Sequence, residues 1–413
     1  MKQYRSLFSN RNFVLLWISS AISNTGDFFN SVALVKVLSE DPEHLGLWMA
    51  LVMIVKVVPG IVLGPLAGVV ADRFPRRTIL VTADVLRAVL VAGLVFAPNP
   101  TVVLLLCSAA ALVSTFAGPA HGALLPTLVK PEELVSANSL FVITGRMAML
   151  IGNGLGAVVM MLVGAHYTFF IDAASFAVAA VLRLCLVLPA AAALVRAGTA
   201  HQGVIARLTS DLKEALVFIR KTKTIRNLMT GLAIVSIPDS ATSVLMTTYF
   251  TVDKGLGAER LGLVWAVMGG AAVVGALAIG ALGNKIPWKY MFSVGCMYAW
   301  GCFMGALLSR GIITSVVFIA LLGVGSGAIN VGIQSAIGLL VPNEVRGRVF
   351  GAWGTLNNLI YVVGVLLGGW LSDTVGATAA MLGFITLYLV AGIQSWFAFR
   401  HEGEPSHAEA AAD

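Results

Sequence analysis

The sequence is dominated by long apolar segments that short polar connections separate. A helix of about 20 residues crosses the hydrocarbon core of a bilayer, so this chain has room for about twelve such helices. Charged residues make up 11% of the chain, against about 25% in a soluble domain. So much apolar surface needs lipid as its solvent. We therefore expect an all-α integral membrane protein with twelve transmembrane helices, at 13–38, 45–71, 79–97, 102–125, 138–163, 167–188, 228–252, 261–283, 288–308, 312–340, 349–371 and 377–399.

The basic residues are distributed unevenly between the two sides of this arrangement. The net charge of +7 could suggest a nucleic-acid partner, but the basic residues do not form one face. Nineteen Lys/Arg fall in the connections on one side, four on the other, and four within the helices. Because cytoplasmic loops carry an excess of Lys and Arg, both termini are predicted to be cytoplasmic. The expected location is the inner membrane of a bacterial cell, and the bilayer, not nucleic acid, is the expected partner.

The chain changes character between its two halves. Residues 189–226 are polar and contain seven Lys/Arg and no spanning segment. Within them, 205–219 has apolar residues at helical spacing, which predicts an amphipathic helix on the cytoplasmic face. The predicted domains are a six-helix bundle at 1–188, this linker at 189–226, a second six-helix bundle at 227–400 and a disordered cytoplasmic tail at 401–413.

The two halves also repeat one another. Four landmarks recur in the same order at offsets of 211 to 216 residues, among them a pair of glycines at Gly152 and Gly156 that matches Gly364 and Gly368. Such glycine pairs are typical of closely packed helices. The repeat predicts two pseudo-symmetric six-helix bundles. Because one chain supplies both halves, a monomer suffices.

The connection between the second and third apolar segments carries a compact charged motif, Gly68-Val-Val-Ala-Asp72-Arg73-Phe-Pro75-Arg76-Arg77. This G-x-x-x-D-R-x-x-R-R string resembles the loop between helices 2 and 3 of the major facilitator superfamily of transporters. The resemblance implies a conformational switch in which glycine allows close helix packing and the charges latch one state. Seven residues form the expected switch: Gly68, Asp72, Arg73, Arg76, Arg77, and the pair Asp84 and Arg87, which share a helix face and are expected to brace the loop.

Three further stretches resemble one branch of that superfamily, the macrolide-efflux and enterobactin exporters. They are 119–140, Phe170-Ile-Asp172-Ala-Ala-Ser175-Phe176, and Arg346-Gly347-Arg348-Val-Phe350. Together with the charged motif they extend over almost the whole chain. Two positions depart from the pattern: Asn153 stands where the branch usually has proline, and Asn284 stands where the first half has Asp72.

Charged residues within the apolar segments are the first candidates for chemistry. A charge at mid-membrane costs about 2.5–3.5 kcal/mol on insertion scales, so each needs a partner or a wet cavity. Asp27 and Lys56 lie at equal depth on neighbouring antiparallel helices. Two interpretations stay open, a structural ion pair and a titratable pair beside the substrate path. Asp239 is a second proton-coupling candidate, although Asn24 aligns with it in the repeat. Arg146 could anchor an anionic substrate or hold the motif helix.

Polar residues form stripes along otherwise apolar helices. In 13–38 they are Ser20, Asn24, Asp27 and Ser31, and in 228–252 a similar stripe runs from Ser236 to Thr247. Such stripes must face the bundle interior or water. Polar contacts between helices could explain any one stripe, but together they favour a substrate cavity. Its candidate residues are Asn24, Ser31, Arg146, Ser243, Asn330, Gln334, Asn357, Asn358 and Tyr361.

These observations predict a secondary transporter that exports a small amphipathic molecule, a drug-like compound or a siderophore, by alternating access and proton antiport. The alternatives are an importer or facilitator of a polar metabolite and a non-transporting receptor with the same fold. The sequence has no nucleotide-binding P-loop and no His/Cys/Asp cluster at metal or nucleophile spacing. It is therefore not predicted to be an enzyme, and no cofactor or metal is expected. The expected partners are the small-molecule substrate, protons and the bilayer.

Overall fold

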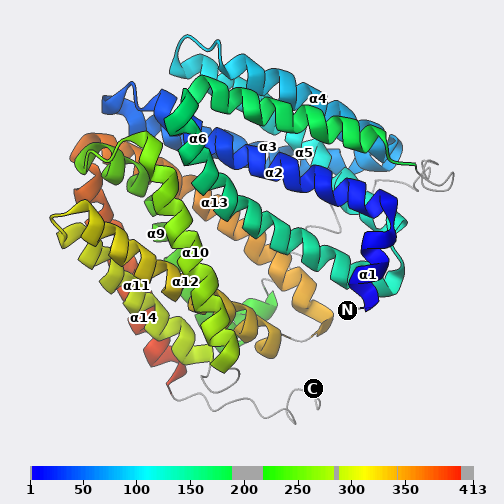
Figure 1. The fold of residues 1–413 in the computed structure, drawn as a ribbon. Helices are drawn as coiled ribbons and strands as arrows, with labels where there is room; N and C mark the ends of the chain where they lie inside the picture. The colour runs from blue at the N-terminus through cyan, green and yellow to red at the C-terminus, as the bar shows by residue number, and fades with distance from the viewer. Residues whose placement is uncertain (1, 188–216, 283–287, 342, 401–413) are drawn as a thin grey trace. The chain divides into compact units, whose positions relative to one another are not determined.

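A computed structural model describes residues 2–187, 217–282, 288–341 and 343–400 (Figure 1). Within these residues the chain forms helices and no strand. Residues 205–216 of the expected amphipathic helix and the tail at 401–413 lie outside the described residues, and residues 217–219 are helical. The main elements are α1 (Lys2–Ser9), α2 (Arg11–Leu38), α3 (Leu45–Arg73), α4 (Arg76–Leu94), α5 (Pro100–Leu128), α6 (Leu134–Leu184), α9 (Lys223–Thr248), α10 (Ala258–Leu282), α11 (Trp288–Leu308), α12 (Ile312–Leu340), α13 (Asn343–Val375) and α14 (Ala377–Phe399).

The helices have the length and composition that a membrane requires. In the described parts of the chain, eight helices are long and apolar enough to cross a membrane. This confirms the all-α, multi-pass membrane architecture, while the count of twelve transmembrane helices stays a prediction. The structure also has three short helical turns: η1 (Pro42–His44) precedes α3, η2 (Pro131–Glu133) precedes α6, and η4 (Tyr249–Asp253) follows α9. The helix α1 was not expected from the sequence. It packs against the rest of the chain through Leu7, which is fully buried.

Two helices begin at the side-chain caps that their sequences supply. Asn10 Oδ1 accepts a hydrogen bond from the Phe13 amide at 3.2 Å at the start of α2. Asn99 Oδ1 accepts one from the Val102 amide at 3.0 Å at the start of α5, where Pro100 follows the cap. In both cases the asparagine satisfies an amide that has no partner within the helix. Each helix therefore begins two residues before the predicted apolar segment.

The two helices expected at 138–163 and 167–188 are the two arms of α6, which bends at Gly164. This residue has φ 84° and ψ 171°, a conformation that suits glycine because any side chain would be strained there. The two arms run on either side of α2 (Figure 1). A Cβ at Gly152, in the first arm, would lie 2.7 Å from Phe28 Cβ, and a Cβ at Gly26 would meet Ser175 in the second arm. The absence of a side chain at Gly26 and Gly152 thus allows α2 to pack closely between the two arms of α6.

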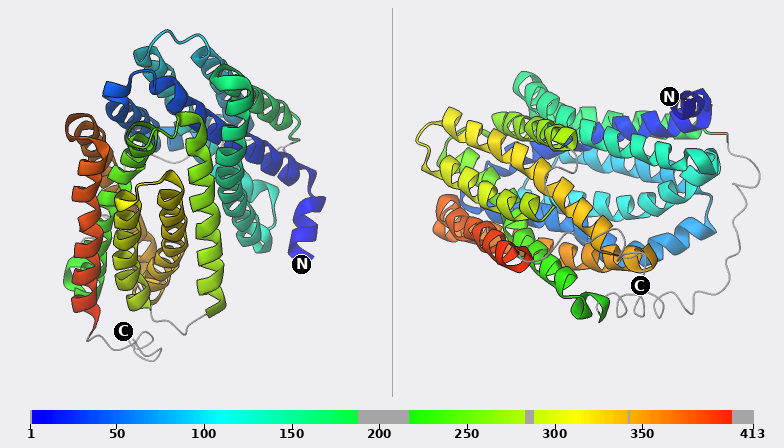
Figure 2. Two further views of the ribbon diagram at one scale, coloured as in Figure 1. Left: turned by 60° about the vertical axis from the view of Figure 1, so that its left-hand side comes forward. Right: turned by 90° about the horizontal axis from the view of Figure 1, so that it is seen from below.

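The chain forms two compact units, which Figure 2 shows from two further sides. In the first, α2 packs against α6, α3 against α5, and α4 against α5 and α6. In the second, α9 packs against α13 and α14, and α11 against α12 and α14.

The sequence repeat is present in the packing of the two units. Gly152 lies against Phe28 in the first unit, and Gly364 lies against Ser240 in the second. Each residue of the second pair is 212 positions after its counterpart in the first. At that offset Asp27 corresponds to Asp239. The expected alignment of Asn24 with Asp239 is therefore wrong, because the helix packing, which the sequence alone does not reveal, sets the register.

Candidate functional site

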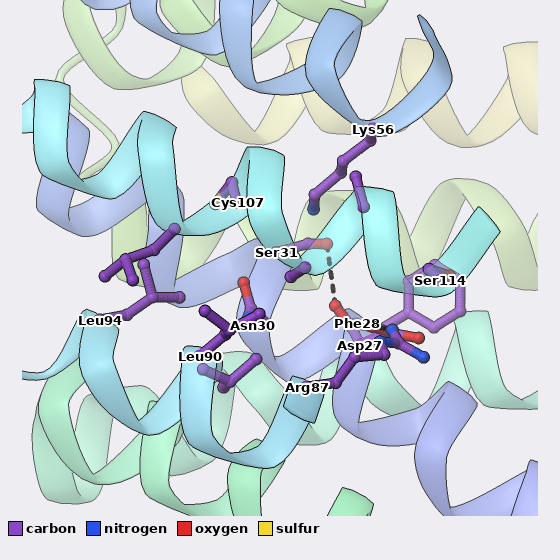
Figure 3. Close-up of a pocket in the computed structure, with 14 residues that line it drawn as sticks. Asp27, Phe28, Asn30, Ser31, Lys56, Arg87, Leu90, Leu94, Cys107 and Ser114 are labelled. Atoms are coloured by element: carbon purple, nitrogen blue, oxygen red, sulfur yellow. Dashed lines mark hydrogen bonds and ion pairs between the residues drawn. The ribbon is translucent and has the colours of Figure 1, made fainter. Parts of the chain in front are cut away.

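A cavity of about 260 Å³ lies within the first unit, between α2, α3, α4 and α5 (Figure 3). Its position near the middle of these helices places polar side chains well inside the apolar segments. Part of its wall is apolar, made by residues of α4 and α5. Its polar lining consists of Asp27, Asn30, Ser31, Lys56, Arg87 and Ser114.

An ion pair between α2 and α4 lies in this cavity. Arg87 Nη2 donates to Asp27 Oδ1 at 2.7 Å. The guanidinium also lies over the ring of Phe176, with its central carbon 3.9 Å from the ring centroid, which allows a cation–π interaction. The Asp27 side chain is 44% exposed and that of Arg87 16%. The Asp27 carboxylate is therefore accessible to a proton from the solvent, while Arg87 is held in place by both Asp27 and Phe176.

The expected pairing of Asp27 with Lys56 is wrong in this structure. Both residues line the cavity, as their equal depth predicted, but Asp27 binds Arg87 instead. Among the described residues, Lys56 makes no ion pair or hydrogen bond, and its side chain is exposed. Residue spacing gave the depth of each side chain along its helix, but the direction each one takes depends on helix rotation, which only packing fixes.

A second ion pair is buried beside the cavity. Arg183 Nη1, on the second arm of α6, donates to the two carboxylate oxygens of Asp84 at 2.7 and 2.8 Å. Arg183 Nε also donates to Ser19 Oγ at 3.2 Å. The expectation that Asp84 and Arg87 act together on one helix face is corrected: Asp84 turns to α6 and Arg87 to α2. The Asp84 side chain is 2% exposed and that of Arg183 7%, which indicates a structural role.

A third acidic residue, Asp172, lies next to a residue of the cavity wall but does not itself line the cavity. Asp172 is fully buried on the second arm of α6. Asn30 Nδ2 donates to its Oδ2 at 2.9 Å, and Ser175 Oγ donates to its Oδ1 at 3.3 Å. Since Asn30 lines the cavity, its carboxamide separates Asp172 from it.

Sequence reasoning missed Asn30 and the role of Arg183. Asn30 stands outside the polar stripe of 13–38, and Arg183 has no acidic neighbour on its own helix face. The only signal in the sequence was an intramembrane arginine with no assigned partner.

In the second unit Asp239 has a different kind of partner. The Tyr388 hydroxyl, on α14, donates to Asp239 Oδ1. Tyr388 and Phe176 are equivalent at the 212-residue offset. Tyr388 binds Asp239 directly, whereas Phe176 packs against Arg87, the partner of Asp27. Ser236 Oγ donates to Asn357 Oδ1 at 2.8 Å, which joins α9 to α13.

The remaining cavity candidates are dispersed. Tyr361 is partly buried and lies beside Ser243, and Asn358 is exposed. Asn24 and Arg146 do not line the cavity of the first unit, and Arg146 is exposed on α6. The side chains of Asn330 and Gln334 lie outside the described residues.

The charged motif joins α3 to α4. Arg76 Nη1 donates to the Ala123 carbonyl on α5 at 2.8 Å, and Arg77 donates to the Leu184 carbonyl at the end of α6. Asp72 and Arg73 are exposed. A Cβ at Gly68 would have no described atom within 4 Å, and the close helix packing expected at this glycine stays a prediction. In this conformation the two arginines of the next helix, not the glycine, make the contacts.

The comparisons with known proteins agree with this architecture. A family model described as Major Facilitator Superfamily matches residues 16–322 and 311–413. The chain belongs to the major facilitator superfamily. An uncharacterised MFS-type transporter, YfiS of Bacillus subtilis, is 28% identical over 402 residues, 94% of each chain. The multidrug efflux pump Tap of Mycobacterium tuberculosis is 28% identical over 347 residues, 79% of each chain. The resemblance to this superfamily is thus confirmed, and the protein is a transporter and not an enzyme.

Solved structures of the superfamily share the fold. A bacterial homologue of the human lysosomal transporter Spinster, inward-facing and unoccupied, gives a TM-score of 0.73 at 13% identity, covering 95% of this chain and 97% of its own. A bacterial homologue of the iron transporter ferroportin, in an inward-facing state, gives 0.73 at 16% identity, covering 92% of this chain and 98% of its own. At these identities the likeness concerns the fold alone.

Proposed function

We propose that this superfamily member is a secondary active exporter of a small amphipathic molecule and that it works by alternating access and proton antiport. The observation that carries the proposal is the cavity of the first unit, which combines an apolar wall with Asp27, Arg87 and Lys56 inside the apolar segments. Charged residues in such positions mark substrate or proton pathways. The multidrug efflux pump Tap, a relative of similar length, supports export as the direction of transport.

In this proposal Asp27 is the coupling carboxylate. A proton on Asp27 neutralises the charge that holds Arg87, so the link between α2 and α4 weakens when Asp27 is protonated. Release of the proton restores the pair. Because the pair joins two helices that line the cavity, proton binding on one side of the membrane and release on the other would bias the two states of the cavity. Asp239, bound by the neutral Tyr388, is the second candidate.

The other predicted site residues keep their roles as proposals. Ser31 extends the polar wall of the cavity. Substrate contacts are proposed for Asn24, Arg146, Ser243, Asn330, Gln334, Asn357, Asn358 and Tyr361, and the conformational switch for Gly68, Asp72, Arg73, Arg76 and Arg77. The protein is proposed to act as a monomer in the bacterial inner membrane, with the domains 1–188, 189–226, 227–400 and 401–413.

Transport by the purified protein tests the function. In proteoliposomes with an imposed pH gradient, a panel of drug-like compounds and siderophores should include at least one that accumulates against its own gradient. Collapsing the pH gradient should abolish this accumulation. Transport that equilibrates a polar metabolite without responding to the gradient would favour the facilitator, and absence of transport across the panel would favour the receptor.

Topology gives a separate test. The excess of Lys and Arg in one set of connections predicts that both termini and the 189–226 segment are cytoplasmic. Single cysteines near position 200 and in 401–413, in a chain without its native cysteines, should react with an impermeant thiol reagent only after the cells are opened. A cysteine in 95–100, on the opposite side, should react in intact cells. Labelling of either cytoplasmic position from outside would overturn the arrangement.

A further inference from the structure

The Lys56 side chain enters the cavity of the first unit without a partner there. It reaches from α3 into the cavity toward Ser31, while Asp27 and Arg87 lie together (Figure 3). We propose that this cavity binds a small organic anion, with a carboxylate, sulfonate or similar group on the Lys56 ammonium and an apolar body against α4 and α5. The inference rests on the proposed function in taking the cavity as the substrate site, and it assigns the charge of the ligand.

The carboxylates near Lys56 are already engaged. Asp27 Oδ1 accepts from Arg87 at 2.7 Å. Asp172 is fully buried, and its two oxygens accept from Asn30 and Ser175. No carboxylate of the described residues lies within ion-pair distance of the ammonium, so the lining of the cavity carries two cations against one anion.

This excess positive charge has a consequence for binding. A lysine well inside a spanning helix is costly unless an opposite charge or water accompanies it. An anionic ligand supplies the missing charge, whereas a cationic ligand would bring like charges together in a space of about 260 Å³. The cavity therefore discriminates in favour of anions.

The rest of the wall sets the kind of anion. Leu90, Val91, Leu94, Leu106, Ala110 and Ala111 form an apolar surface on α4 and α5. The volume is just below the lower end, about 300 Å³, of the usual range for small-molecule sites. A ligand with one or two rings, or a short branched chain, and a single anionic group matches both the size and the lining.

A protection experiment tests the charge of the ligand without requiring transport. Ser114, on the cavity wall, is replaced by Cys in a chain whose four native cysteines have been replaced. The protein is then placed in nanodiscs made of lipids that carry no net charge. The rate of modification by a small uncharged methanethiosulfonate is measured with naphthalene-2-sulfonate or with 2-naphthylmethylammonium, a matched anion and cation. The anion should slow modification saturably, by about threefold or more, and the cation should not.

Variants at Lys56 assign the effect. Lys56→Arg should keep the protection by the anion, and Lys56→Gln should abolish it. Lys36→Gln, which removes a lysine from the last turn of α2 outside the cavity, should leave protection intact. Equal or stronger protection by the cation, protection unchanged in Lys56→Gln, or no protection by either probe would each overturn the proposal. So would a failure of the Ser114→Cys thiol to react at all, because the cavity must be accessible.

A second readout measures the effect of the Lys56 charge with the thiol reagents themselves. At the same cysteine, a sulfonate-bearing methanethiosulfonate should react faster than a trimethylammonium-bearing one, after correction for their rates with free cysteine. Lys56→Gln should reduce this ratio by about threefold or more, since one unit charge is removed. An unchanged ratio would contradict the proposal. Both readouts stand whether or not proton antiport is found, so the inference and the proposed function can fail separately.

Discussion

Asp27→Asn is expected to abolish proton-driven accumulation, so that the substrate reaches the same concentration on both sides of a proteoliposome membrane. The amide oxygen can still accept from Arg87, which preserves the link between α2 and α4, but an amide does not exchange a proton with the solvent. Substrate exchange between equal compartments should therefore continue. The measurement is uptake with and without an imposed pH gradient, followed by counterflow at equal pH, using a compound found in the transport panel.

The equivalent aspartate of the second unit is the matched control. Asp239→Asn also replaces a carboxylate with an amide, at the position 212 residues later, but its partner is the neutral Tyr388. It should keep accumulation driven by the gradient. If Asp239→Asn loses that accumulation and Asp27→Asn keeps it, the coupling role belongs to α9. If both variants keep it, the Asp27–Arg87 pair is structural.

Arg183→Met is expected to destabilise the fold more than any substitution in the cavity wall. It would leave the Asp84 carboxylate, 2% exposed, without the cation that binds both of its oxygens. Removing one partner of a buried ion pair typically costs about 3–5 kcal/mol, because the other charge stays buried. The measurement is the midpoint of thermal unfolding of the purified protein in detergent, together with the amount recovered from membranes.

Two companion variants separate this effect from the loss of a positive charge. Arg226→Met removes an exposed arginine at the start of α9 whose side chain donates to the Arg220 carbonyl, and it should leave the midpoint nearly unchanged. The double variant Asp84→Leu with Arg183→Met removes both buried charges and should recover much of the lost stability. An unfolding midpoint of Arg183→Met equal to that of the parent would show that Asp84 finds another partner.

The sequence alone was sufficient for the membrane architecture and the superfamily. Apolar segments of bilayer length, the distribution of Lys and Arg and the Gly68–Arg77 motif are local properties of the chain, and the helices begin and end close to the predicted residues. The glycine pair at Gly152 and Gly156 was predicted to pack closely, and Gly152 does meet Phe28. Side-chain chemistry also identified Asp27, Lys56 and Arg87 as unusual, because charge within an apolar segment needs no structure to be noticed.

The partner of each charge was decided only by the tertiary structure. Asp27 binds Arg87 and not Lys56, and Asp84 binds Arg183 and not Arg87. Position along a helix gives the depth of a side chain, but its direction depends on how each helix is rotated about its axis and which neighbour it meets. Those rotations come from contacts such as Gly26 against Ser175, between residues far apart in the sequence. The depth of each charged side chain can therefore be predicted from the sequence, whereas its partner on another helix depends on the packing of the whole unit.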